Sequence, residues 1–311
     1  MQERRNKQRI VLFIVLLCAT AFAYWFTSKR EKIDDVDKTI FKNFDLNTID
    51  SISLESPKGN VVLTYNGSRW RVNGKFAADA SMIDVLFATL QQAEPRRPLA
   101  MALRDSVVLN LKETGVKVSL TAAGTVIESF FAGGNVAKIQ AYFLDTEGDT
   151  PYLMTIPGYR VYVSGIFELP ESGWRDKIVF GFNWRNFQRL EMSFPERPSD
   201  NFVVAMDKNY FSIQGLTQVD TTKLNDFLDD VSLLSVEDYL MPNEISDSLS
   251  GVHPIVSVVV TDIGKREYRL RLYRPIGPGR QWYGLIDETQ WALFQENKMG
   301  AVIRPRNFFV K

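Results

Sequence analysis

The signals that best predict the fold lie in residues 49–90, IDSISLESPKGNVVLTYNGSRWRVNGKFAADASMIDVLFATL. Residues 49–56 alternate apolar and polar side chains, as a half-buried strand does, and Asn60–Tyr65 follows as a second strand after a Pro-Lys-Gly turn. Asn66-Gly67 favours a two-residue hairpin turn, because both residue types accept positive φ. We therefore expect Arg69–Val72 to pair as a third strand.

An amphipathic helix is expected directly after these strands. Asp79 is of a type that caps helix N-termini, and apolar residues follow it at helical spacing: Met82, Ile83, Leu86, Phe87 and Leu90. The later part of this region predicts more strands, at Val107–Leu111, Val116–Ala122, Ile127–Phe131 and Ala141–Leu144. Strands grouped around single helices predict the α+β class.

The same pattern occurs a second time in the chain. Ile49-x-x-Ile52-x-Leu54 recurs as Phe187-x-x-Leu190-x-Met192, and four further pairs are each 141 positions apart: Asn60 and Asn201, Trp70 and Phe211, Gly74 and Gly215, Asp79 and Asp220. Agreement of Asn, Gly and Asp in one register is much harder to obtain by chance than agreement of apolar residues. We therefore expect two tandem similar lobes at 41–181 and 182–311, each an antiparallel sheet packed with one or two helices.

The sequence of the second lobe predicts helices and strands of its own. A helix begins near Asp220, and strands are expected at Ile255–Val260 and Glu267–Tyr273. Asp287 is predicted to open a late helix, with Gln290 at the capping-box position and with Trp291 and Phe294 on its apolar face.

The N-terminal region predicts a membrane anchor. Residues 10–28, IVLFIVLLCATAFAYWFTS, carry no charge and are long enough to cross a bilayer, with Ile10, Leu12, Phe13, Leu16, Leu17, Trp25 and Phe26 among the anchoring side chains. Residues 1–9 form a cytoplasmic tail whose Arg4, Arg5, Lys7 and Arg9 favour an N-terminus that stays inside. Residues 29–40 are a charged stalk, so the main body is expected outside the cytoplasm, on the periplasmic side of the inner membrane.

A cleavable signal peptide is the alternative interpretation of this segment. Ala19-Thr20-Ala21 and Ala21-Phe22-Ala23 both offer small residues at alternate positions. The bulky residues Tyr24-Trp25-Phe26 continue the apolar run past both sites, which favours an uncleaved anchor.

Composition excludes several classes of function. Lys and Arg together number 37, as do Asp and Glu, so no bulk positive charge attracts nucleic acid. One Cys (Cys18) and one His (His253) exclude a disulfide framework and a Cys/His zinc site. No Walker or dinucleotide-binding pattern is present, and we expect no cofactor, no metal and no catalytic residue. Calcium at the acidic loop 145–149 and a carboxylate-dependent hydrolase remain alternatives.

Several of these pieces carry a family resemblance. The anchor, Ile49–Leu54, Trp70–Val72, Asp79–Leu90 and the terminal Trp174-Arg175-Asp176-Lys177 resemble the bacterial domain-of-unknown-function 4340 family of single-pass envelope proteins. Members are often associated with ABC-type transport systems, including those linked to gliding motility. The resemblance implies an accessory role outside the membrane and supplies no catalytic residues.

Two surfaces are candidates for partner binding. Trp174, Arg175, Asp176 and Lys177 combine residue types that are enriched at interface hot spots, although a role in joining the two lobes is the competing interpretation. Arg269, Arg271 and Tyr273 share one face of a predicted strand and suit an acidic partner or lipid headgroups, or simply a solvated face.

The expected function is that of a non-enzymatic, membrane-anchored accessory subunit of an envelope complex. An ABC-type transport or gliding/secretion assembly is the expected setting, with permease subunits as partners. The alternative is a solute- or glycan-binding module with its ligand between the lobes.

Overall fold

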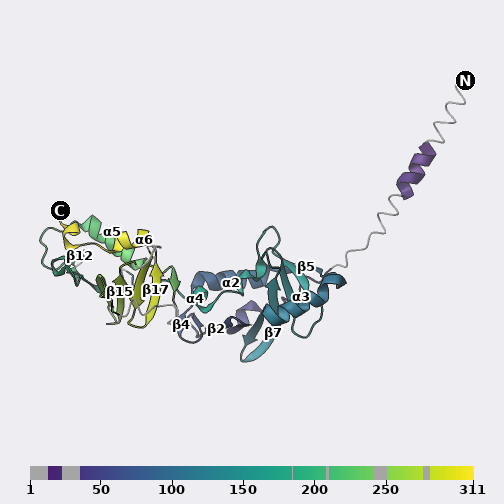
Figure 1. The fold of residues 1–311 in the computed structure, drawn as a ribbon, viewed down its shortest axis with the longest axis horizontal. Coiled ribbons are helices and arrows are strands. Elements are labelled where there is room, and N and C mark those ends of the chain that lie inside the picture. The colour runs from purple at the N-terminus through teal and green to yellow at the C-terminus, as the bar shows by residue number, and fades with distance from the viewer. Residues whose placement is uncertain (1–12, 23–35, 184, 208–209, 241–250, 276–280) are drawn as a thin grey trace, which may run out of the picture. The chain divides into compact units, whose positions relative to one another are not determined.

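The structure is a computed structural model that describes residues 13–22, 36–183, 185–207, 210–240, 251–275 and 281–311. It confirms the α+β class, with two antiparallel sheets of nine and eight strands and helices packed on them (Figure 1). Residues 13–22 are helical and exposed. The predicted basic tail, both ends of the predicted anchor and most of the predicted stalk lie outside the described residues.

Among the described residues, no helix combines the length and the apolar character that crossing a bilayer requires.

The first sheet has the strand order β4-β3-β2-β1-β6-β7-β8-β9-β5. Its strands are β1 (Ser51–Ser56), β2 (Gly59–Tyr65), β3 (Trp70–Val72), β4 (Phe76–Ala77), β5 (Glu94–Pro98), β6 (Val116–Ala122), β7 (Thr125–Gly134), β8 (Ala141–Asp145) and β9 (Tyr152–Thr155). The helical elements along this part of the chain are η1 (Leu46–Thr48), α2 (Ala80–Gln92), α3 (Met101–Thr114) and η2 (Val163–Ile166), and α4 (Glu171–Trp174) follows and contacts β13. The Asp79 carboxylate accepts hydrogen bonds from the N–H groups of Ser81 and Met82, which confirms the predicted cap of α2.

The second sheet has the order β12-β11-β10-β14-β15-β16-β17-β13. Its strands are β10 (Phe187–Ser193), β11 (Phe202–Asp207), β12 (Tyr210–Ile213), β13 (Asp238–Tyr239), β14 (Val256–Asp262), β15 (Glu267–Tyr273), β16 (Trp282–Ile286) and β17 (Gln290–Phe294). Its helical elements are η3 (Pro198–Asp200), α5 (Thr221–Ser232), α6 (Glu296–Val302) and η6 (Arg306–Phe309). Asp220 caps α5 through the N–H of Lys223, as predicted.

Both sheets run through their strands in the same order. Without β4, the first sheet reads β3-β2-β1-β6-β7-β8-β9-β5, and each strand has a counterpart at the same place in β12-β11-β10-β14-β15-β16-β17-β13. In the first sheet the Asp-capped helix α2 follows β4, the short strand after β3. In the second sheet the Asp-capped helix α5 follows β12. Helix α3 lies between β5 and β6 in the chain, whereas residues 241–250, at the corresponding place, are outside the described residues.

Helices α5 and α6 pack on one face of the second sheet. The apolar face of α5, with Leu224, Phe227, Leu228 and Val231, joins α6 and the inward side chains of the sheet in one buried cluster. Alternate residues of the central strands point into this cluster, for example Val256, Val258 and Val260 of β14. Figure 1 shows both helices on the same side of β15 and β17.

Three local predictions were wrong, each for a physical reason. Val107–Leu111 belongs to helix α3, because Val107, Val108 and Leu111 pack on the sheet at helical spacing while Leu109 is exposed. The turn after β2 has four residues rather than two, since Tyr65 pairs with Trp70 and only Gly67 takes a positive φ.

The third error concerns the predicted late helix at Asp287. Asp287 and Glu288 both have positive φ and turn the chain into strand β17, so Gln290–Phe294 follows a two-residue period instead of a helical one. Ala292 and Phe294 point into the core, and the helix begins only at Glu296. The helix-cap signal was therefore a hairpin signal.

Contacts divide the chain into two compact units. The first comprises residues 1–60 and 85–168, and the second comprises residues 61–84 and 169–311. This division passes through β2 and α2, whereas the predicted lobes meet at residue 181; the predicted lobe boundaries stay a prediction.

Candidate functional site

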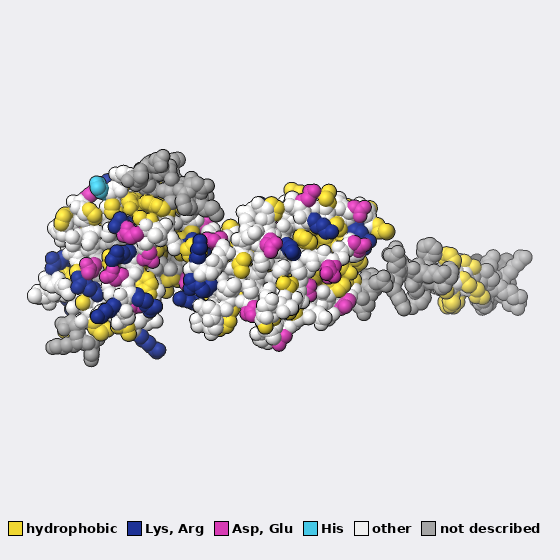
Figure 2. Space-filling view, turned by 90° about the horizontal axis from the view of Figure 1, so that it is seen from below, with side chains coloured by type: hydrophobic (Ala, Val, Ile, Leu, Met, Phe, Trp, Pro, Cys, Tyr) yellow, Lys and Arg dark blue, Asp and Glu magenta, His cyan; other side chains and the backbone are white. Residues whose placement is uncertain are grey.

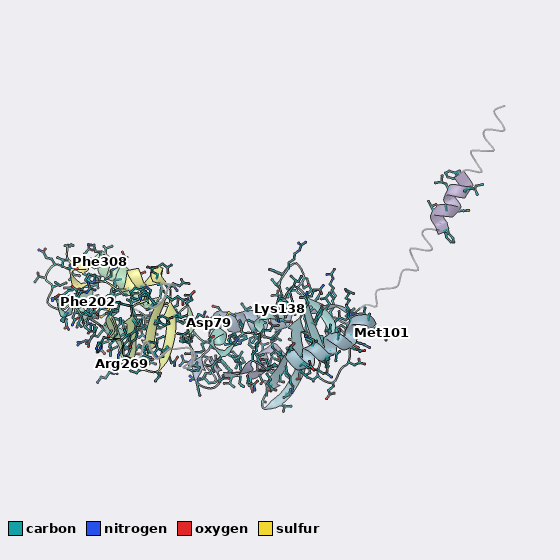
Figure 3. All side chains as sticks on the ribbon, viewed as in Figure 1. Asp79, Met101, Lys138, Phe202, Arg269 and Phe308 are labelled. Atoms are coloured by element: carbon teal, nitrogen blue, oxygen red, sulfur yellow. The ribbon has the colours of Figure 1, made fainter. Side chains whose placement is uncertain are left out.

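The candidate site is the face of the second sheet opposite α5 and α6, which we call the open face. Strand alternation and register bring to it Arg189, Glu191, Ser257, Val259, Thr261, Glu267, Arg269, Arg271, Tyr273, Tyr283, Leu285, Trp291 and Leu293. All of these except Tyr273 are exposed or half-exposed. Figure 3 shows Arg269 on the opposite side of the sheet from Phe308, and Figure 2 shows cationic and anionic side chains intermixed over this part of the chain.

One half of the open face carries charges in pairs. Arg189 contacts Glu191 at 2.8 Å, Arg271 contacts Glu288 at 2.8 Å, and Arg269 pairs with Glu267. The hydrogen bond from Arg269 to Glu267 raises the pKa of Arg269, so this residue stays cationic.

These pairs contribute little to stability. Their side chains are 38–50% exposed, and exposed ion pairs are worth about 0–1 kcal/mol because solvent screens them. Their charges are therefore available to a partner at small cost.

The other half of the open face is aromatic and aliphatic. Register places Tyr273 beside Tyr283, and Leu285 lies between Arg271 and Trp291. Tyr273 is only 5% exposed because its ring packs 5.0 Å from the ring of Trp291. Trp, Tyr and Arg are the residue types that dominate binding energy at protein interfaces, and here they lie side by side.

A shallow groove of about 350 Å³ crosses the charged half. Its lining includes the carboxylates of Glu191, Glu267 and Glu288 and the guanidinium groups of Arg269 and Arg271. This set of donors and acceptors can bind a polar surface of either sign.

The second predicted surface, Trp174–Lys177, lies largely in the interior of the second unit. Trp174 is fully buried and Arg175 is 8% exposed. The backbone of this segment is also engaged, since the N–H of Asp79 donates to the carbonyl of Trp174 at 2.9 Å. Asp176 is exposed and Lys177 half-exposed, so these two side chains remain available to a partner.

The Arg175 side chain forms a clamp between two rings. Its guanidinium lies 3.7 Å from the ring centroid of Phe76 and 3.5 Å from that of Tyr239, and it donates to the amide oxygen of Gln290. Burial lowers the pKa of Arg175 and raises the pKa of Tyr239. These contacts tie strand β4 to strands β13 and β17, which is a structural role for this arginine.

The remaining sequence candidates are dispersed. His253 is exposed, and the acidic loop 145–149 is a turn in which Asp145 accepts from the N–H of Glu147. Among the described residues, no three His, Cys, Asp or Glu side chains group as a metal site. Phe13, Leu16 and Leu17 lie on the exposed helix 13–22, and the other anchor and topology residues lie outside the described ranges.

Sequence reasoning missed the carboxylates and the aromatic half of the site. Glu191 lies on β10, Trp291 on β17 and Glu288 in the turn between β16 and β17, and only the strand register brings them beside Arg269 and Arg271. The period-2 pattern of Gln290–Phe294 was the available signal, and its assignment to a helix concealed Trp291.

Comparison with known proteins gives one match. The family model described as "Domain of unknown function (DUF4340)" matches residues 70–249, more than half of the chain. The chain belongs to the DUF4340 family. The matched region includes β3, α2, the Trp174–Lys177 segment and α5, but not β15–β17, which supply most of the open face. Neither the search of curated proteins nor the search of solved structures found a match.

Proposed function

We propose that this DUF4340 protein is a non-enzymatic, membrane-anchored, extracytoplasmic accessory subunit of an envelope complex, and that it acts through protein–protein contacts made by the open face. The setting we propose is an ABC-type transport or gliding/secretion assembly. The observation that carries the proposal is the pairing of an arginine-rich half and an aromatic half on one sheet face that no helix of the described residues covers.

The first sheet supplies an internal reference for this argument. There, α3 packs against the corresponding face, over Phe131, Tyr142 and Leu144. Phe131 pairs with Lys117 and Leu144, just as Arg271 pairs with Ser257 and Leu285, so Phe131 and Arg271 occupy equivalent places. A phenylalanine suits a helix-covered position, whereas an arginine suits a surface that meets water or a polar partner.

The proposal includes an internal duplication, with two tandem similar lobes. Equal strand order supports it, and so do matched backbone contacts at the end of each copy. The N–H of Asp79 donates to the carbonyl of Trp174, and the N–H of Asp220 donates to the carbonyl of Phe309, both at 2.9 Å. These contacts place Trp174 and Phe309 at equivalent positions of the two copies.

Anchoring by residues 10–28, with the N-terminus inside and the main body periplasmic, remains part of the proposal. Its support is the uncharged segment and the four basic residues before it.

The test is a pull-down of the tagged full-length protein from native membranes in mild detergent. We expect ABC permease or other envelope-complex subunits in constant proportion, and loss of these subunits with the double variant Arg269→Glu/Arg271→Glu. Arg197→Glu is the matched control, because Arg197 is also an exposed, ion-paired arginine of the second unit but lies outside the open face. A protein recovered alone, or partners retained equally by both variants, contradicts the proposal.

A solute- or glycan-binding role is the second candidate, and the groove lined by Glu191, Glu267 and Arg271 favours it. Such a ligand raises the melting temperature of the wild-type protein by mass action and leaves the melting temperature of the Arg271→Glu variant unchanged. A panel of envelope glycans and charged solutes in a thermal-shift assay distinguishes the two roles.

A further inference from the structure

Two loops of the first unit present large apolar side chains to solvent. Residues 135–140 connect β7 to β8, and residues 156–162 follow β9. Val136 is 103% exposed and Ile139 74% in the first loop, while Tyr159 is 65% and Val161 52% exposed in the second. Exposed apolar side chains gathered in this way mark an interaction site more often than single ones do.

Local hydrogen bonds fix the shape of both loops. The side-chain oxygen of Asn135 accepts from the N–H groups of Ile139 and Gln140, both at 3.0 Å. In the second loop, Pro157 and Gly158 occupy the central positions of a turn closed by the Tyr159 N–H and the Ile156 carbonyl at 3.0 Å, and Gly158 supplies the positive φ of 82°. The apolar tips are therefore held in place before any partner arrives.

A polar network joins the two loops into one surface. The Lys138 ammonium lies 2.7 Å from both carboxylate oxygens of Glu168 and 3.3 Å from the Tyr162 hydroxyl, and this hydroxyl donates to Glu168 at 2.6 Å. Lys138 is labelled in Figure 3. The Tyr162 ring packs so closely against Gly134 that no side chain would fit there, so the second loop lies directly against the end of β7.

The chemistry of the tips suits the interfacial region of a bilayer. Residues 135–140 and 156–162 contain no Asp or Glu, and they combine aliphatic side chains with Tyr159 and Arg160, while the charge of Lys138 is paired with Glu168. Aliphatic residues beside Tyr and basic residues are the set that lies at headgroup depth. An acidic or strongly polar protein surface would not match so many exposed apolar side chains.

The chain path brings this surface close to the proposed anchor. Lys38, near the end of the predicted stalk, contacts Glu94 at 3.1 Å, and Glu94 pairs with Thr155, the last residue before the second loop. Lys38 is ten residue steps from Ser28, so the tether between them spans at most about 35 Å. The loops are therefore confined to a short distance from the bilayer that residues 10–28 would cross.

We propose that the tips of these two loops, at Val136, Ile139, Tyr159 and Val161, insert into the headgroup layer of the same bilayer as a second membrane contact. This proposal rests on the anchor of the proposed function. It fixes which side of the first unit faces the membrane.

The test places a fluorophore at each tip of the full-length protein. In a Cys18→Ser background, Val136→Cys or Tyr159→Cys carries an environment-sensitive dye, and the protein is reconstituted in vesicles of phosphatidylethanolamine and phosphatidylglycerol. We expect nitroxide lipids to quench both dyes several-fold more strongly than a dye at Thr222→Cys, an exposed control position on α5, and aqueous iodide to quench them less. Adding Val136→Asp and Ile139→Asp should remove lipid quenching at Tyr159→Cys.

Two readouts separate this proposal from the anchor. Extraction of the protein by alkaline carbonate contradicts the anchor, and therefore the proposed function as well. If the protein stays in the membrane after carbonate extraction and iodide quenches the tip dyes as strongly as the Thr222→Cys dye, only the loop insertion is overturned. Protection of the tips in native membranes without quenching by lipid assigns the loops to a protein partner and also overturns it.

Discussion

Substitution of Arg175 tests whether the clamp holds the second unit together. The guanidinium lies between the rings of Phe76 and Tyr239 and donates to Gln290, and the side chain is 8% exposed. Arg175→Ala removes all three contacts at once. Arg175→Lys keeps the charge but loses the planar group that stacks on both rings.

The magnitude follows from these contacts. Each partly desolvated cation–π contact is worth about 1 kcal/mol, and the hydrogen bond contributes about 1 kcal/mol more, which gives about 3 kcal/mol in total. Burial lowers the pKa of Arg175, so removal of the charge relieves an unfavourable desolvation that offsets part of this sum. We expect Arg175→Ala to lower the free energy of unfolding by about 2 kcal/mol, and Arg175→Lys by about half as much.

The assay is equilibrium urea unfolding of the full-length protein in mild detergent, followed by tryptophan fluorescence. Arg197→Ala is the matched control, since its guanidinium lies over the Phe194 ring at 5.3 Å but its side chain is 59% exposed. We expect this control to cost less than about 1 kcal/mol. Equal costs for Arg175→Ala and Arg197→Ala would refute the clamp and return Arg175 to the list of partner-binding residues.

Three further changes test the sheet and its turns. Asp262 accepts hydrogen bonds from the backbone N–H and the side chain of Arg266, and these hold the pKa of Asp262 below its usual range. The stability that the ionised carboxylate provides is complete above about pH 4 and is lost as the pH falls through the folded-state pKa. Asp262→Asn should therefore lower the melting temperature at pH 7 and approach wild type in acid, and a difference that persists at low pH contradicts this. Gly284→Ala should cost about 1–3 kcal/mol in urea unfolding, because a Cβ there lies 2.5 Å from a core phenylalanine ring; an unchanged midpoint would show that the core has room. Phe131→Arg should lower the free energy of unfolding by about 2 kcal/mol because Phe131 packs beneath α3, whereas Arg271→Phe should change it by no more than about 0.5 kcal/mol. Equal losses for the two variants would show that the two sheet faces do not differ in how they are covered.

Sequence periodicity was sufficient for most of the fold because each correct element depends on local chemistry. Both Asp caps and the alternation in Glu267–Tyr273 are local signals, and the structure confirms them. Errors arose where two structures share one local signal. An Asp followed three residues later by Gln suits a helix start, yet Asp287 and Glu288 take left-handed φ and make a hairpin.

The candidate site was predictable only in part. The shared face of Arg269 and Arg271 follows from a period of two. The buried state of Tyr273 does not, because it depends on Trp291, which lies two strands away across the sheet. The clamp could not be predicted from the sequence either, because Phe76, Arg175 and Tyr239 come from segments about 60–100 residues apart in the chain.

Comparison of equivalent positions in the two sheets suggests how one fold would serve two purposes. Tyr142 and Leu144 of the first sheet align with Tyr283 and Leu285 of the second, so the apolar strip is present in both. The neighbouring position differs, with Phe131 under α3 in one sheet and Arg271 in the other. If the open face only met water, nothing would favour keeping tyrosine and leucine at its centre, since their exposure is unfavourable. An apolar strip beside an arginine suits a partner that covers both, which is the role we propose for this face.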